Sequence, residues 1–259
     1  ALNWSSDNYD NVQSSVWPLL KQSVVNNFGN RELNHASSKL YSGVNVFLDI
    51  YKDNPFIKAH TSAQKTGAHL CEAMLRAKEF GAHKQLDIVS FSLGTVVALH
   101  YLLTLEQIEL DSLGGGFNRF SIGDVLLMGS CVDKHALLSN VHRLIGSKGI
   151  IRNKLTVVYS RNDTVLKYLF KLAKLNEDAI GYEGMTVDEV VDALRTNDAD
   201  LKARSRFDVE CIVRKKFDCY DLTDIIVSHC DYRPKLSYVL KLIGYKNNYE
   251  FVDSCYVRS

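Results

Sequence analysis

One serine of this chain stands where a nucleophile could be activated. Residues 86–95 read LDIVSFSLGT, an apolar run followed by a small-x-Ser-x-Gly pattern and a helix-like segment. A serine hydroxyl is a weak nucleophile unless a sharp strand-to-helix turn exposes it and a neighbouring base takes its proton. Such a turn also directs the helix N-terminus, and with it the Leu93 N–H, at a developing oxyanion. The sequence therefore predicts Ser92 as a nucleophile at an elbow, with Ser90 and Gly94 as the small residues that a crowded turn requires.

The Ser90 position departs from the usual pattern, which has glycine there. The alternative interpretation is a helix start that contains serine and glycine and carries no chemistry.

An acid and a base follow Ser92 in the chain order serine, acid, histidine. Asp163 comes after the apolar run 155–159, and His229 comes after the apolar run 225–227. We expect His229 to take the Ser92 proton and return it to the leaving group, while Asp163 orients the imidazole. Three further carboxylates are rival acids, and the other histidines fall in helical or loop surfaces where a structural role is the simpler interpretation. The rival acids are Asp133, Asp221 and Asp224.

Short apolar strands alternate with helical patterns along the chain, which predicts parallel βαβ units and a sheet covered on both faces. The sequence indicates one α/β domain over residues 1–259, with an insertion or cap at about 173–206. Expected strands are 86–89, 124–128 and 155–159, with one or two more in 207–220. Expected helices are 17–25, 40–51, 61–80 (capped by Thr61 or Ser62 and by Gly81), 95–105, 134–144, 165–175, 187–194 and 236–243.

Composition excludes several function classes. With 31 Lys plus Arg against 30 Asp plus Glu, the chain has no basic footprint for nucleic acid and no polybasic membrane patch. Six cysteines without a C-x-x-C pair indicate reduced, mostly buried thiols of an intracellular, reducing compartment. A zinc site from Cys211, Cys219, Cys230 and a histidine matches no common spacing, so we expect no metal and no organic cofactor. The start, ALNW, lacks an initiator Met and predicts a processed or truncated N-terminus.

Four segments carry a resemblance to a known family: the elbow, VLLMGS at 125–130, VVYSRNDTVL at 157–166 and SHCDYRPKL at 228–236. They resemble the α/β-hydrolase domain of the transmembrane and coiled-coil domain protein family, a lipase-like group. The resemblance implies an α/β-hydrolase-type sheet and the roles of Ser92, Asp163 and His229, with Tyr232 beside the base. It also implies membrane segments upstream.

The same resemblance implies that a strand and loop before the elbow helix donate a second oxyanion N–H and are absent from this chain. We therefore expect a serine hydrolase that cleaves a carboxylic ester or lipid through an acyl-enzyme, with an upstream segment or partner chain completing the sheet. The alternative is a catalytically silent subunit or scaffold of a larger assembly. An acyltransferase with the same three residues is a further alternative.

Overall fold

The computed structural model describes residues 55–77, 84–111, 120–170 and 178–245. The chain divides into two units, Ala1–Asn54 and Pro55–Ser259, and all described residues lie in the second. The expected helices at 17–25 and 40–51 and the cap at Gly81 lie outside the described residues.

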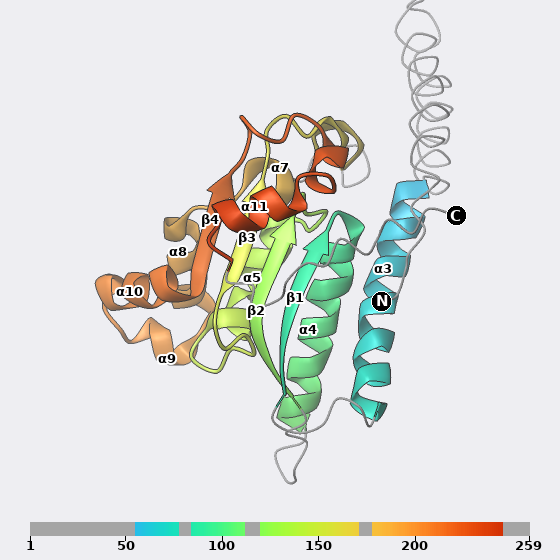
Figure 1. The fold of residues 1–259 in the computed structure, drawn as a ribbon. Helices are drawn as coiled ribbons and strands as arrows, with labels where there is room; N and C mark the ends of the chain where they lie inside the picture. The colour runs from blue at the N-terminus through green and yellow to red at the C-terminus, as the bar shows by residue number, and fades with distance from the viewer. Residues whose placement is uncertain (1–54, 78–83, 112–119, 171–177, 246–259) are drawn as a thin grey trace, which may run out of the picture. The chain divides into compact units, whose positions relative to one another are not determined.

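A parallel sheet forms the centre of the described part (Figure 1). Its order is β1-β2-β3-β4, and each neighbouring pair runs parallel. The strands are β1 (Lys84–Phe91), β2 (Phe120–Met128), β3 (Leu155–Tyr159) and β4 (Phe217–Asp221). The predicted α/β class is confirmed.

Helices connect the strands and cover both faces of the sheet. They are α3 (Pro55–Arg76), α4 (Leu93–Asp111), α5 (Lys134–Ile145), the π-helix η1 (Val165–Phe170), α7 (Ile180–Glu183), α8 (Val187–Asn197), α9 (Ala199–Lys202), α10 (Arg206–Lys216), the 3-10 helix η2 (His229–Tyr232) and α11 (Leu236–Leu242).

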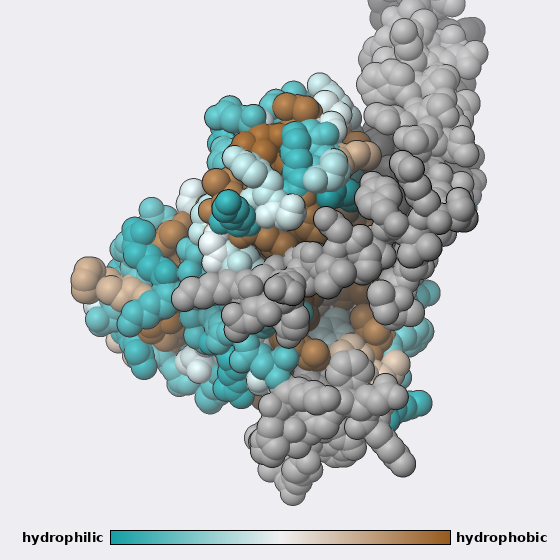
Figure 2. Space-filling view, in the orientation of Figure 1, coloured by the Kyte–Doolittle hydropathy of each residue, from teal (hydrophilic) through white to brown (hydrophobic). Residues whose placement is uncertain are grey.

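Alternate residues of the strands point into two separate cores, as the period of two in a strand requires. Val125 and Leu127 of β2 belong to the larger core, which α3, α4, α5, α8 and α10 complete. Leu126 and Met128 belong to a second core under α11. Residues 125–128 of β2 and 155–158 of β3 are therefore buried on both sides of the sheet, which explains why these two segments read as apolar runs. The outer strands differ, since Asp87 and Val89 of β1 and Asp221 of β4 are exposed. In Figure 2 the surface over α9 and α10 is mostly hydrophilic, and apolar surface is exposed beside α11.

The start of α3 differs from the prediction. The helix begins at Pro55, so Thr61 and Ser62 lie inside it and cap nothing. Proline is well tolerated in the first helical turn, where its missing N–H would have no partner in any case.

The segment 207–220 also differs from the prediction of strands alone. Residues 206–216 form α10, and only 217–221 form a strand. Ser205 caps the helix by accepting a hydrogen bond from the Asp208 N–H, and Val209 and Val213, four residues apart, are buried on one face. The segment expected as an insertion contains α7, α8 and α9, and α8 packs against α5 and α10.

Candidate active site

Ser92 occupies the single residue between the end of β1 and the start of α4. Its φ is 55°, in the left-handed region that a serine rarely adopts. The Ser92 N–H donates to the Met128 carbonyl at 3.0 Å, and the Thr95 N–H donates to the Ser92 carbonyl at 3.0 Å. These two hydrogen bonds hold the strained residue between the sheet edge and the first helical turn.

The two flanking small residues differ in their surroundings. Ser90 is buried, and its hydroxyl donates to the Leu126 carbonyl at 3.0 Å, so the extra oxygen is satisfied within the sheet. Gly94 is exposed, and a Cβ placed on it would meet no heavy atom within 4 Å. The expected crowding is therefore absent at Gly94.

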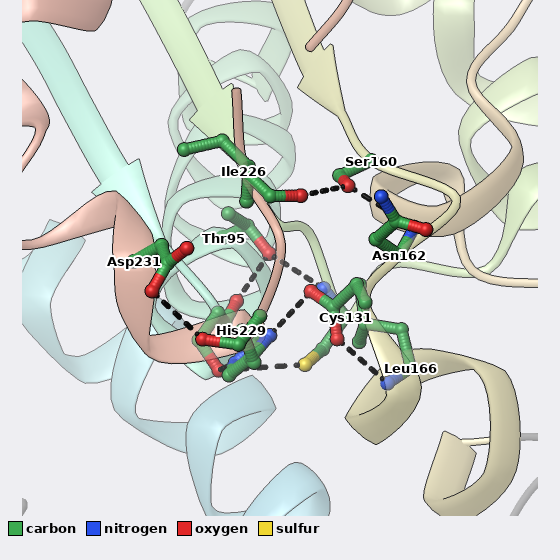
Figure 3. Close-up of polar contacts among 11 residues, drawn as sticks. Thr95, Cys131, Ser160, Asn162, Leu166, Ile226, His229 and Asp231 are labelled. Atoms are coloured by element: carbon green, nitrogen blue, oxygen red, sulfur yellow. Dashed lines mark hydrogen bonds and ion pairs between the residues drawn. The ribbon is translucent and has the colours of Figure 1, made fainter. Parts of the chain in front are cut away.

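The structure brings Ser92, His229 and Asp163 together in one hydrogen-bonded chain (Figure 3). The Ser92 Oγ lies 2.7 Å from His229 Nε2, and His229 Nδ1 lies 2.6 Å from Asp163 Oδ2. Asp163 Oδ1 also accepts the Leu166 N–H at 3.0 Å. Because an ionised carboxylate only accepts, Nδ1 carries the proton toward Asp163, and Nε2 of the neutral ring accepts from the Ser92 hydroxyl.

All three side chains are buried, with exposed fractions of 7% for Ser92, 3% for His229 and 0% for Asp163. The Phe91 ring packs against the imidazole at a centroid distance of 4.9 Å and against the Tyr232 ring at 5.5 Å. Burial and the charge of Asp163 raise the pKa of Tyr232, so this side chain stays neutral beside the histidine. The apolar surroundings strengthen the hydrogen bonds of the chain.

Cys131 is a neighbour of Ser92 that the sequence did not indicate. Its Sγ lies 3.7 Å from the Ser92 Oγ, and the residue is fully buried at the end of β2. Burial raises the pKa of the Cys131 thiol to about 12. The sequence does hold one clue to this position. Cys131 comes three residues after the second apolar strand, and neighbouring parallel strands end at the same edge of the sheet.

The buried hydroxyls of Thr95 and Ser130 form hydrogen bonds that hold the turn at Ser92 in place. The Thr95 hydroxyl donates to the Ser92 carbonyl and accepts from the Ser130 hydroxyl at 2.9 Å. The Cys131 N–H also donates to the Thr95 hydroxyl, at 3.2 Å. These contacts link the first turn of α4 to the segment after β2, which fixes the backbone on both sides of the candidate nucleophile.

Leu93 is the first residue of α4. Within the part of the chain that the structure describes, its N–H has no assigned hydrogen-bond acceptor. The N-terminus of a helix carries a partial positive charge, so this N–H is a suitable donor to an anion that develops beside Ser92.

Two of the three rival acids have other partners. Asp133 caps α5 by accepting the Ala136 N–H at 2.6 Å. Asp221 accepts from the Tyr159 hydroxyl at 3.0 Å and from the Thr223 N–H at 2.9 Å. Asp224 is exposed. The carboxylate that forms a hydrogen bond with the His229 ring is that of Asp163.

The cysteines are more varied than expected. Cys71 and Cys131 are buried, Cys219 is half-buried, and Cys211 and Cys230 are exposed, so the prediction of mostly buried thiols is wrong for the last two. Among the described residues, no three His, Cys, Asp or Glu side chains converge as metal ligands.

The described part of the chain is thus an α/β protein with a hydrogen-bonded serine, histidine and aspartate at the end of its strands. The chain belongs to the family described as protein of unknown function (DUF726), which matches residues 12–193. It is also similar to the uncharacterized membrane protein F35D11.3 of Caenorhabditis elegans, with 24% identity over 194 residues. That match covers 75% of this chain and 25% of the relative, so the chain spans about a quarter of the relative's length.

No solved structure matches this chain. Within residues 55–77, 84–111, 120–170 and 178–245, no helix has the length and apolar character needed to cross a membrane.

Proposed function

We propose that this protein is a serine hydrolase of the α/β-hydrolase type that cleaves a carboxylic ester through an acyl-enzyme. The observation that carries the proposal is the pair of hydrogen bonds from Ser92 Oγ to His229 Nε2 at 2.7 Å and from His229 Nδ1 to Asp163 Oδ2 at 2.6 Å. The left-handed φ of Ser92 supports it, because strain of this kind is concentrated at functional sites.

The mechanism follows from the direction of the two hydrogen bonds. His229 removes the Ser92 proton as Oγ attacks the ester carbonyl, and the imidazolium is stabilised by the Asp163 carboxylate. The Leu93 N–H, with the positive end of α4, faces the oxyanion of the tetrahedral intermediate. His229 then gives its proton to the departing alcohol, which leaves an acyl group on Ser92. A water that His229 deprotonates then attacks this acyl group. The bond between the acyl carbon and Ser92 Oγ breaks, His229 returns the proton to Oγ, and the acid is released.

The neighbours of Ser92 favour a substrate with an apolar acyl chain. The Sγ of the buried Cys131 lies 3.7 Å from the Ser92 Oγ, and the Phe91 ring packs against the His229 ring at a centroid distance of 4.9 Å. The lipase-like resemblance of the four sequence segments points the same way. The Caenorhabditis elegans relative is described as a membrane protein, which supports membrane association of this protein. We propose an intracellular lipid or other ester as the substrate, with no metal or organic cofactor.

A second candidate is a catalytically silent subunit or scaffold. The observation that favours it is that Leu93 is the one oxyanion donor we can assign among the described residues. Loss of one donor typically costs about 10²–10³-fold in rate. An upstream segment or a partner chain would supply the second donor under the first proposal.

Labelling with a fluorophosphonate probe separates the two candidates. We expect the protein to be labelled on Ser92, and the Ser92→Ala variant to lose all labelling. Asp163→Asn should slow labelling by a factor on the order of 10⁴. Without the carboxylate, the tautomer of His229 that carries its proton on Nδ1 and accepts the Ser92 proton at Nε2 is no longer favoured. The matched control is Ser139→Ala, an exposed serine of α5, which should label like the wild type.

Absence of labelling in both this chain and the full-length protein would overturn the hydrolase proposal and favour the silent scaffold. Labelling of the full-length protein alone would assign the second oxyanion donor to a segment outside this chain.

A further inference from the structure

His229 lies on a loop whose backbone is held by side chains on both sides. The loop, residues 225–231, lies between β4 and α11 and includes the first three residues of η2. On its inner side the buried Ser160 hydroxyl donates to the Ile226 carbonyl at 2.6 Å (Figure 3). On its outer side two charged side chains, Asp231 and Lys235, bond to the loop. The position of the imidazole therefore depends on contacts outside the hydrogen-bonded chain of Ser92, His229 and Asp163.

The Asp231 carboxylate bonds to the two residues that precede His229. Its Oδ2 accepts the Val227 N–H at 3.0 Å. Its Oδ1 accepts the Ser228 hydroxyl at 2.8 Å, which is the dashed line at Asp231 in Figure 3. A carboxylate that bonds to two successive residues restricts the dihedral angles on the N-terminal side of the histidine.

Lys235 completes the outer side. Its Nζ donates to the Ile225 carbonyl at 2.6 Å and to Asp231 Oδ2 at 3.2 Å. One ammonium group thus joins the start of the loop to the carboxylate at its end. Because Lys235 immediately precedes α11, the loop is also tied to the helix that covers the second face of the sheet.

We propose that Asp231 and Lys235 are positioning residues that hold the His229 imidazole within hydrogen-bond distance of Ser92. The expected effect on the reaction rate rests on the proposed function. The expected effect on the position of the imidazole rests on the structure alone. Displacement of a catalytic group by about 1 Å costs on the order of 100-fold in rate. The hydrogen bonds of Asp231 and Lys235 go to the loop backbone, to the Ser228 hydroxyl and to each other. We therefore expect their effect on rate to exceed their effect on stability.

The side chains of Asp231 and Lys235 are separate from the apolar residues that anchor this loop in the core. The Asp231 and Lys235 side chains are 23% and 38% exposed, whereas Ile226 and Tyr232 fill the core under α11. Partly exposed ion pairs contribute little to global stability. Their hydrogen bonds to the loop backbone fix a local conformation instead.

The experiment compares variants of the pair with matched controls. Asp231→Ala and Lys235→Met remove one side each, and Lys235→Arg keeps the charge and the donors. Asp224→Ala changes an exposed carboxylate of the same region, and Lys241→Met changes an exposed lysine of α11. The two readouts are the rate of fluorophosphonate labelling and the strongly downfield NMR resonance of the His229 Nδ1 proton, with the melting temperature measured alongside.

We expect Asp231→Ala and Lys235→Met to slow labelling by about 10-fold to 100-fold and to weaken or abolish the downfield resonance. Lys235→Arg should restore both, and the two controls should resemble the wild type. Unchanged labelling and an unchanged resonance in both Asp231→Ala and Lys235→Met would overturn the proposal. A loss of labelling that tracks a large fall in melting temperature would also overturn it, because the role would then be structural.

The NMR readout keeps the two proposals apart. If the wild type is not labelled but the resonance disappears in Asp231→Ala, the proposed function fails and the positioning role stands. If the wild type is labelled and all variants match it in both readouts, the positioning role fails and the proposed function stands.

Discussion

Ser92 combines an unfavourable backbone conformation with hydrogen bonds that hold it there. A left-handed φ costs a residue with a Cβ about 1–2 kcal/mol. The Met128 carbonyl accepts the Ser92 N–H, and the first turn of α4 binds the Ser92 carbonyl, so neighbouring elements stabilise the strained residue. The result is a hydroxyl that reaches His229 Nε2 while its own backbone is fixed.

The cysteines offer a test of burial at single residues. Burial raises the pKa of Cys71 to about 11 and that of Cys131 to about 12, and both have 0% exposure, so neither thiol forms a reactive thiolate at neutral pH. Cys211 and Cys230 are exposed. We expect limited alkylation of the folded protein at pH 7.5 to modify Cys211 and Cys230 before Cys71 and Cys131, as measured by peptide mass spectrometry.

Full alkylation after denaturation is the control for peptide recovery. Rapid modification of Cys131 in the folded protein would contradict its burial. It would mean that the reagent reaches the neighbourhood of the Ser92 side chain.

At the scale of elements, α3 and α4 approach closely at Gly67. A Cβ on this residue would lie 2.4 Å from the Val97 carbonyl oxygen and 2.8 Å from the His100 Cβ. Backbone and Cβ atoms of a helix cannot move aside locally, so any added side chain must push the two helices apart. Because α4 begins beside Ser92, this contact fixes the axis of the helix that presents the Leu93 N–H.

Gly67→Ala should therefore destabilise the protein by about 1–3 kcal/mol, the usual cost of overpacking. Urea unfolding measures this loss. Lys65→Ala, on the exposed side of the same helix, should change stability little. An equal stability of Gly67→Ala and the wild type would mean that the helices are not in close contact at this position.

At the scale of the whole molecule, several carboxylates stabilise the fold only while they are ionised. Burial raises the pKa of Glu189, but hydrogen bonds from Lys134 and Thr186 outweigh it and hold the pKa below its ordinary value of 4.5. Hydrogen bonds outweigh burial in the same direction for Asp198 and Asp221.

A pKa that is lower in the folded state than in the unfolded state gives stability that is complete above the unfolded value. That stability is lost as the pH falls through the folded value. The free energy of unfolding should thus be steady from pH 7 to about 5 with respect to these groups and fall below about pH 4. Urea titrations at a series of pH values measure it. Stability that rises below pH 4 would contradict the sign of these shifts.

The sequence by itself determined the α/β class and the three residues of the candidate site. Strands that are buried on both faces read as apolar runs, and parallel strands end at a common edge of the sheet. The sequence pattern alone therefore predicts that polar residues following such runs lie at this edge. Asp163 follows this rule, because it comes shortly after β3. His229 does not, because the apolar run 225–227 that precedes it forms a turn and irregular backbone after β4 and no strand. The sequence also predicted Ser92, because the elbow pattern is local.

Tertiary structure decided what depends on neighbours distant in the chain. Pro55 opens α3 although a proline also ends helices, and 206–216 form a helix because Val209 and Val213 find a common core. Cys131 reaches the Ser92 hydroxyl, and Asp231 and Lys235 hold the loop of His229, through contacts that no local period records. Propensity and pattern act within one element, whereas the distance between two side chains depends on how elements pack, and that packing is a property of the folded chain alone.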